Sequence, residues 1–167
     1  VKTDKRFVAN YKNGAWDNGV ITDDDKVVIS ECAGVLQYSQ SCFEGMKAYT
    51  TENGHTVIFR PDMNASRMAD SCRRLEMPVF PEDKFVEAIA ETVRANEDWV
   101  PPYGSGASLY IRPYMFGSNP VIGVKPADEY QFRAFVTPVG PYFKGGAKPI
   151  TIKVSDFDRA APHGTGH

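Results

Sequence analysis

The most informative segment of the sequence is Ser108-Leu109-Tyr110-Ile111-Arg112-Pro113-Tyr114-Met115-Phe116. Its aromatic and β-branched residues predict a β-strand. Because side chains alternate across a strand, Arg112 shares a face with Tyr110 and Tyr114, and Ile111 lies on the other face. A guanidinium among aromatic side chains has two interpretations. Arg112 either points into water from an edge strand or forms a planar fork for a ligand carboxylate, to which Tyr110 adds a hydroxyl.

Strand and helix patterns surround this stretch on both sides. Short strands are expected over residues 7–11, 19–22, 26–30, 45–50, 56–60 and 129–136, with turns at Asn13-Gly14 and Asn53-Gly54. Two helices are expected, over 62–76 and 81–96. The apolar face of the second consists of Phe85, Ala88, Ile89, Thr92 and Val93. Residues 33–41 form either a short helix or an irregular turn. The fold class predicted is therefore α+β, an antiparallel sheet with two helices.

Domain boundaries are expected where the composition changes. Residues 1–139 are predicted to form a small N-terminal domain, and 140–148, rich in Gly, Pro and Lys, an interdomain linker. Residues 149–167 are predicted to begin a second, larger domain, with a new strand over 149–154. The chain opens on Val1 rather than Met and closes in a glycine-rich loop. We therefore expect a fragment of a longer protein.

Composition places the chain among ordinary globular proteins. Its 167 residues are 42% hydrophobic and 24% charged, which excludes a disordered or fibrous chain. The net charge of -2 gives no reason to expect a nucleic acid or a membrane surface as partner. No apolar run approaches the roughly 20 residues of a membrane span. The three cysteines (Cys32, Cys42 and Cys72) have no metal-site spacing and fit reduced, buried thiols in a cytoplasmic protein.

Common functional motifs are absent from the sequence. It contains no P-loop, no complete dinucleotide fingerprint, no nucleophile elbow and no zinc-type spacing of Cys and His. The remaining pocket candidates each have a plainer alternative. Arg67 is either a solvated helical cation or a phosphate anchor, and Tyr38 and Phe43 are either core residues or walls of an apolar pocket. Lys47 is either a surface lysine or a Schiff-base amine.

Five stretches in order resemble the fold-type IV pyridoxal phosphate enzymes, and specifically the branched-chain amino acid aminotransferases. The first two are Leu36-Gln37-Tyr38 with Cys42-Phe43-Glu44-Gly45-Met46-Lys47-Ala48-Tyr49, and Phe59-Arg60-Pro61-Asp62-Met63-Asn64 with Ser66-Arg67-Met68. The others are Leu109-Tyr110-Ile111-Arg112-Pro113, Val139-Gly140-Pro141-Tyr142-Phe143, and Arg159-Ala160-Ala161-Pro162-His163-Gly164-Thr165-Gly166-His167. Each motif alone is weak, but their order and spacing hold over nearly the whole chain.

The resemblance implies an activity and its binding residues. It implies transfer of the amino group between leucine, isoleucine or valine and 2-oxoglutarate, with pyridoxal 5'-phosphate as cofactor, in a homodimer. Arg67 resembles the arginine that binds the cofactor phosphate, and Tyr110 with Arg112 resembles the pair that meets the distal carboxylate of glutamate. The implied substrate-binding residues are Tyr38, Phe43, Tyr110, Arg112, Tyr142 and Val124. Val124 lies in a loop, 117–125, that resembles the one crossing to the other subunit's pocket.

One residue that the family needs is missing. Its Schiff-base lysine follows a segment like Gly164-Thr165-Gly166-His167 almost immediately, and the sequence ends at His167. We therefore expect no catalytic residue in this chain, no covalently bound cofactor and no activity from these 167 residues alone. Two alternatives stay open. One is another fold-type IV enzyme, a D-amino acid aminotransferase or a lyase, and the other is a non-catalytic domain for binding or dimerisation.

Overall fold

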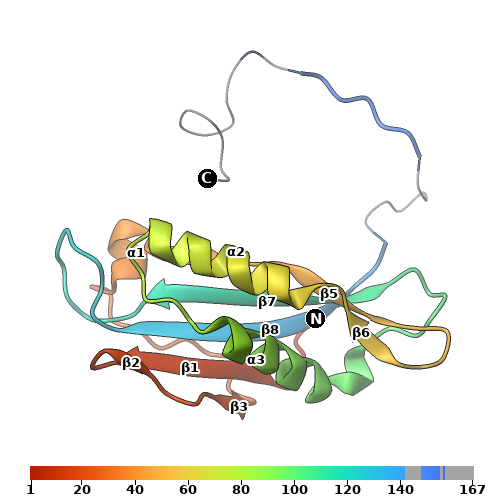
Figure 1. Cartoon of the computed structure of the whole chain (residues 1–167), viewed down its shortest axis with the longest axis horizontal. Coiled ribbons are helices and arrows are strands. Elements are labelled where there is room, and N and C mark those ends of the chain that lie inside the picture. Colours follow the sequence, from red (N-terminus) through yellow and green to blue (C-terminus); the bar gives the residue numbers. More distant parts are fainter. Residues whose placement is uncertain (142–147, 155, 157–167) are drawn as a thin grey trace.

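The computed structural model describes residues 1–141, 148–154 and 156. In this part, strands and helices combine into the α+β fold expected from the sequence (Figure 1). The strands are β1 (Arg6–Lys12), β2 (Ala15–Trp16), β3 (Val20–Thr22), β4 (Ser41–Phe43), β5 (Met46–Thr50), β6 (Thr56–Ile58), β7 (Ser108–Gly117) and β8 (Tyr130–Val139). The helices are α1 (Gly34–Tyr38), α2 (Pro61–Arg74) and α3 (Glu82–Arg94), followed by a 3₁₀ turn at Glu97–Trp99.

These strands form one antiparallel sheet. Its order is β2-β1-β8-β7-β5-β6, with β3 paired to β1 and β4 paired to β7. The long strands β7 and β8 pair along their whole length and form the centre. Because Phe43 lies opposite Tyr114 and Met46 opposite Ile111, β4 and β5 continue one register along β7. They are therefore one strand, interrupted at residues 44–45.

The helix ends follow from local chemistry. α2 begins at Pro61, where the missing N–H is one of the donors that a helix leaves unpaired in any case. Arg60 before it takes the left-handed conformation (φ 45°), as does Glu76 beyond the other end (φ 54°). α3 begins with Glu82 and Asp83, whose negative charge suits a helix N-terminus. Both predicted helices are confirmed.

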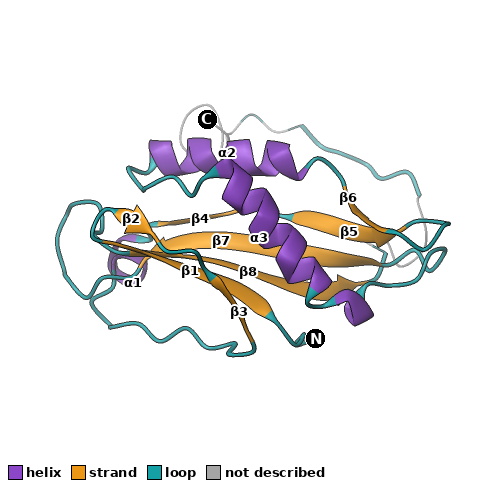
Figure 2. Cartoon of the chain, turned by 60° about the horizontal axis from the view of Figure 1, so that its bottom comes forward, coloured by secondary structure: helices purple, strands orange, loops and turns teal. Residues whose placement is uncertain are grey.

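α2 and α3 pack on the same face of the sheet and enclose the hydrophobic core (Figure 2). The predicted face of α3 is the buried one. From the sheet, Leu109, Ile111 and Met115 of β7 are each 0% exposed. Alternation along β7 therefore directs every second side chain into the core, as the sequence indicated.

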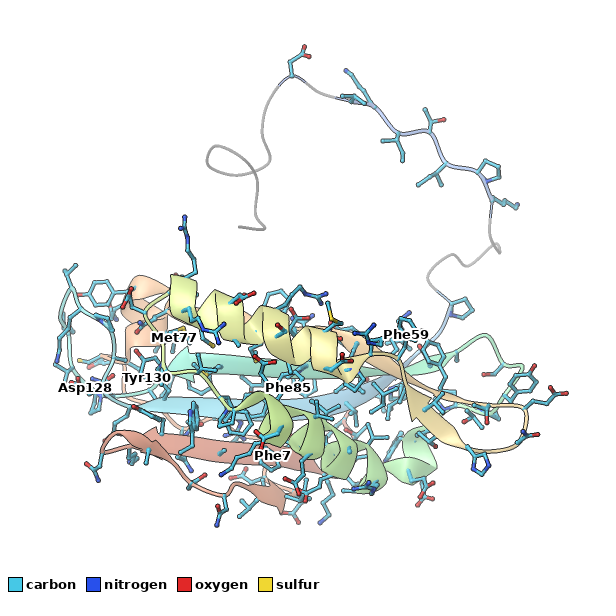
Figure 3. The ribbon with its side chains drawn as sticks, in the orientation of Figure 1. Phe7, Phe59, Met77, Phe85, Asp128 and Tyr130 are labelled. Atoms are coloured by element: carbon cyan, nitrogen blue, oxygen red, sulfur yellow. The ribbon has the colours of Figure 1, made fainter. Side chains whose placement is uncertain are left out.

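Aromatic rings fill the space between α3 and the sheet. Phe80 stacks on Phe132, with ring centroids 4.1 Å apart. Phe7 meets Phe132 edge-on at 6.1 Å, and Phe85 lies 5.7 Å from the same ring. Figure 3 shows Phe7 and Phe85 in this layer. Edge-to-face and offset ring pairs add to the stabilisation that burial alone gives.

Three expectations about strands need correction. Residues 26–30 form no strand but run as an irregular segment over the sheet, where the carbonyl of Lys26 accepts a hydrogen bond from the Arg133 side chain instead of from a neighbouring strand. Residues 149–154 form no strand with the described part of the chain. β4 is an addition to the predicted strands, since its first residue falls in the stretch 33–41, for which the sequence predicts a helix or a turn. The turn at Asn13-Gly14 is confirmed by positive φ at both residues (53° and 81°).

None of the helices in the described part of the chain has the length and apolarity of a membrane span.

Candidate functional site

The open face of the sheet carries an apolar cavity of about 510 Å³. It lies on the side opposite α2 and α3, where Tyr110, Arg112 and Tyr114 project from β7. This volume is within the range of small-molecule sites. The remaining lining residues come from an irregular segment, from α1 and from three strands: Val27, Ile29, Val35, Leu36, Ser41, Cys42, Phe43, Phe116, Phe135 and Thr137.

Arg112 is the only guanidinium among the lining residues, and two aromatic side chains hold it. Its central carbon lies 4.1 Å from the ring centroid of Phe43. Its Nε and one Nη donate hydrogen bonds to the hydroxyl of Tyr110, at 3.1 and 2.7 Å. Because β7 is a central strand, the edge position in the alternative interpretation of Arg112 is wrong. A cation held over an apolar cavity can bind a carboxylate there.

Gly45 makes this arrangement possible. In the register shared by β4 and β5, Gly45 stands opposite Arg112. A Cβ at Gly45 would lie 2.5 Å from the Tyr110 hydroxyl oxygen, closer than real contacts allow. The missing side chain therefore leaves room for the hydroxyl that orients Arg112.

Arg67 is held by a second hydrogen-bond network, around Glu44, on the side of the β4–β5 strand that faces α2. Its Nε and Nη2 donate to the carboxylate of Glu44 at 2.9 and 2.6 Å, and Asn64 donates to Glu44 at 2.8 Å. The Glu44 side chain is only 10% exposed, whereas that of Arg67 is 62% exposed. The hydrogen bonds and charge of Glu44 raise the pKa of Arg67. Arg67 therefore stays cationic, oriented and accessible.

Residues 43–45 connect the two networks. Phe43 and Gly45 face the cavity, and Glu44 between them faces α2, as alternation along a strand requires. The main-chain N–H of Glu44 donates to the carbonyl of Pro113 at 2.9 Å and keeps this stretch on β7. Arg67 and Arg112 thus act on opposite sides of one short piece of backbone.

The irregular segment 23–29, which crosses the open face, closes one side of the cavity. Arg6 donates to the carbonyl of Asp23 at 2.6 Å, and Arg133 donates to that of Lys26 at 3.1 Å. Both arginines are buried, at 6% and 7% exposure. These bonds hold the segment that carries Val27 into the cavity wall. Sequence patterns gave no sign of this role, because the two arginines are far from the segment along the chain.

The residues suggested by sequence do not all converge. Phe43, Tyr110 and Arg112 meet at the cavity, and Arg67 lies behind Glu44. Tyr38, at the end of α1, is 43% exposed and is not among the residues that line the cavity, and Val124 is 95% exposed in the loop after β7. Tyr142 lies outside the described residues.

Several residues of the site were not expected. Glu44, Asn64, Tyr114 and Phe135 take part in it, although the family resemblance gives Glu44 and Asn64 no role. Burial raises the pKa of Tyr114 above its ordinary value, so its hydroxyl stays protonated at neutral pH. No group of three or more His, Cys, Asp or Glu side chains suited to a metal ion occurs among the described residues.

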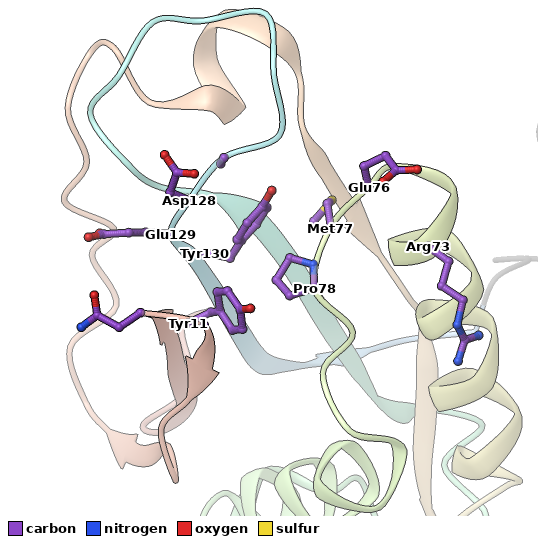
Figure 4. A pocket seen from close by; sticks show the side chains of 11 residues that line it. Tyr11, Arg73, Glu76, Met77, Pro78, Asp128, Glu129 and Tyr130 are labelled. Carbon is purple, nitrogen blue, oxygen red and sulfur yellow. The ribbon is translucent and has the colours of Figure 1, made fainter.

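A larger cavity, about 780 Å³, lies elsewhere, between the β1–β2 turn and the end of α2 (Figure 4). It is lined by Arg73, Glu76, Asp128 and Glu129 among others. Three of these charges are already paired: Arg73 with Asp70 at 2.7 Å, Glu129 with Lys12 at 3.1 Å, and Asp128 with Lys125 at 2.8 Å. The cavity on the open face, with its apolar walls and single held cation, is therefore the better candidate site.

The architecture is that of the fold-type IV pyridoxal phosphate enzymes, a curved antiparallel sheet with α2 and α3 on one face. The crystal structure of the Escherichia coli branched-chain amino acid aminotransferase matches it with a TM-score of 0.70 and 28% identity, over 98% of this chain and 50% of that one. A second branched-chain amino acid aminotransferase, in complex with N-(5'-phosphopyridoxyl)-L-glutamate, matches with a TM-score of 0.61 and 27% identity, over 81% of this chain and 41% of that one.

In sequence, the chain is similar to the branched-chain-amino-acid aminotransferases over nearly its whole length, which confirms the resemblance. The Haemophilus influenzae branched-chain-amino-acid aminotransferase is 51% identical over 99% of this chain and 48% of its own length. The chain spans about half the length of the curated relatives it matches. No protein-family model matches it.

Proposed function

We propose that this chain is part of a pyridoxal phosphate-dependent transaminase that moves the amino group between leucine, isoleucine or valine and 2-oxoglutarate. The observation that carries the proposal is the group of Phe43, Tyr110 and Arg112 around Gly45. It combines a held cation with apolar walls, and such a pocket can accept both an acidic and a branched apolar side chain.

The residues of this chain fit the phosphate of the cofactor. Arg67 is exposed and permanently charged, and its Nε and Nη2 are fixed by Glu44. Its Nη1 makes no hydrogen bond within the described residues, so it can donate to a phosphate oxygen. Bound pyridoxal phosphate supplies the electron sink for chemistry at the α-carbon of an amino acid.

Substrate discrimination is divided between two kinds of surface. The rings of Phe43, Tyr114 and Phe135 form apolar walls for a branched side chain, and Arg112 with the Tyr110 hydroxyl binds the distal carboxylate of glutamate. Tyr38, Val124 and Tyr142 are further substrate-binding residues in this proposal. Val124 is highly exposed, which suits a residue that enters the pocket of the second subunit of a homodimer.

The 167 residues alone are proposed to be inactive, because the sequence contains no counterpart of the family's Schiff-base lysine. The proposal also places residues 1–139 in a small domain, 140–148 in a linker, and 149–167 at the start of a larger domain. A cytoplasmic location is consistent with three free cysteines.

Turnover measurements test the proposal. The complete protein that carries this sequence should convert L-leucine with 2-oxoglutarate and added pyridoxal phosphate, and should leave D-alanine unchanged. The 167-residue chain should give no turnover under the same conditions. Turnover of D-alanine in preference to L-leucine would contradict the substrate assignment, and turnover by the short chain would contradict its inactivity.

A further inference from the structure

Cys42 and Cys72 meet in the fold although thirty residues of chain separate them. Their sulfur atoms are 3.8 Å apart. Cys42 lies in β4, beside Phe43, and Cys72 lies in the last turn of α2. The third cysteine, Cys32, belongs to neither element and has no such partner among the described residues.

We propose that Cys42 and Cys72 form an oxidant-sensitive dithiol, which a peroxide converts to a disulfide that ties β4 to α2. A disulfide requires sulfur atoms about 2.05 Å apart. The two sulfur atoms must therefore move closer together by a distance smaller than an atomic diameter. Rotation of the two side chains, with a small shift of β4, can supply this movement. The proposal does not depend on the proposed function.

Exposure decides the order of the two steps. Cys42 is half-buried, whereas Cys72 is 0% exposed. The oxidant therefore reaches the sulfur of Cys42 first. Cys72 is shielded and can react only with its neighbour.

The chemistry balances with hydrogen peroxide as the two-electron oxidant. The Cys42 thiolate attacks one peroxide oxygen, the O–O bond breaks, and hydroxide leaves, giving a sulfenic acid. The Cys72 sulfur then attacks the Cys42 sulfur, the S–O bond breaks, and the S–S bond forms. The two thiol protons end in the two water molecules produced.

The pKa values of the two thiols affect the two steps differently. The hydrogen bond to Cys72 and burial raise the pKa of Cys42, and the same hydrogen bond lowers the pKa of Cys72. The first attack is therefore the slow step and becomes faster as the pH rises. The second step is fast, because Cys72 is the thiol of the pair that loses its proton more readily.

The consequence for the site is mechanical. A bond between Cys42 and Cys72 would fix the strand residue that precedes Phe43 to the helix that carries Arg67. Both arginine networks contact residues 43–45, so oxidation would restrict the movement of this backbone. The oxidised chain should therefore unfold at a higher temperature than the reduced chain, because the cross-link restricts the unfolded state.

Mass spectrometry of the 167-residue chain tests the proposal. After treatment with hydrogen peroxide under denaturant-free conditions, the intact mass should fall by two hydrogen atoms. Tryptic digestion without reductant should join the peptide 27–47 to the peptide 68–73. The Cys32→Ser variant serves as the control. Its peptide 27–47 has Cys42 as the sole cysteine and should form the same cross-link.

Two variants distinguish the order of the steps. Cys72→Ser should leave a sulfenic acid on Cys42 that dimedone traps, and Cys42→Ser should leave Cys72 unmodified. Circular dichroism of each variant verifies that the fold is retained, and the Cys32→Ser result stands if either variant does not fold. The proposal is overturned if all three thiols of the oxidised wild type remain open to alkylation after unfolding, or if the cross-link joins Cys32 instead.

Discussion

The two faces of β7 differ in chemistry although the same ten residues supply both. On the helix face, Leu109, Ile111 and Met115 are completely buried in the core. On the open face, Tyr110 and Arg112 remain partly accessible above a cavity. The difference indicates that one face stabilises the fold, while the other is available for binding. Substitutions on the two faces should therefore separate stability from ligand recognition.

The largest effect is expected from Phe132→Ala, on the helix face of β8. Phe132 is 0% exposed and contacts three aromatic rings. Its truncation should lower the free energy of unfolding by about 3–5 kcal/mol in urea denaturation. The matched control is Phe135→Ala, on the open face of the same strand and 38% exposed. Equal losses of unfolding free energy in the two variants would contradict the difference between the two faces.

A smaller loss is expected from Arg67→Ala. It leaves the Glu44 carboxylate, 10% exposed, with Asn64 as its remaining side-chain partner. Because Arg67 itself is largely exposed, we expect a loss of about 1–2 kcal/mol in the free energy of unfolding. Arg74→Ala on the same helix, exposed and outside the Glu44 network, is the control and should stay within about 0.5 kcal/mol of wild type. A wild-type value for Arg67→Ala would show that the ion pair contributes nothing to stability.

Gly45→Ala should disturb the open face directly. The new methyl group would displace the Tyr110 hydroxyl and lengthen its hydrogen bonds to Arg112. Overpacking of this kind costs roughly 1–2 kcal/mol, here reduced because Tyr110 can move toward the cavity. Thermal unfolding measures the loss, with Gly140→Ala, which meets nothing within 4 Å, as the control. Indistinguishable melting temperatures for the two variants would contradict the close approach at Gly45.

The smallest effect concerns alkaline pH and one tyrosine from each face. Burial raises the pKa of Tyr114 on the open face and of Tyr130 on the helix face above the ordinary value of 10.0. The folded state then binds more protons than the unfolded state above that pH, so stability should be complete below about pH 10 and fall as the pH rises through the folded-state pKa. Tyr114→Phe and Tyr130→Phe should each flatten this decline in denaturation curves, and the exposed Tyr103→Phe should not. If neither variant altered the decline, the alkaline loss of stability could not be attributed to Tyr114 and Tyr130.

The sequence predicted those parts of the fold that depend on short-range patterns. The alternation in 108–116 indicated which β7 residues share a face, and the spacing of Phe85 and Ile89 indicated the buried side of α3. It could not predict contacts between distant segments. Glu44 meets Arg67 only because α2 packs across β4, and no local pattern encodes that crossing. The segment 26–30 has the composition of a strand, but the buried Arg133 side chain, distant along the chain, binds its Lys26 carbonyl where a sheet neighbour would otherwise do so.

The same limit explains why only part of the site could be predicted. Arg112 and Tyr110 could be placed together because they are two residues apart on one strand. Phe43 joined them through a strand pairing that the sequence did not indicate. The central position of β7, which excludes the edge-strand interpretation of Arg112, is a property of the whole sheet.

The role of Arg112 is tested by comparing two substrates in the complete protein that carries this sequence. Arg112→Ala should lower kcat/KM for 2-oxoglutarate roughly 10- to 100-fold, the value of a hydrogen bond to a charged group. The same variant should leave kcat/KM for the keto acid of leucine within about threefold of wild type, because that side chain meets only apolar walls. Equal losses for both substrates would contradict the proposal that the open face of β7 recognises the distal carboxylate.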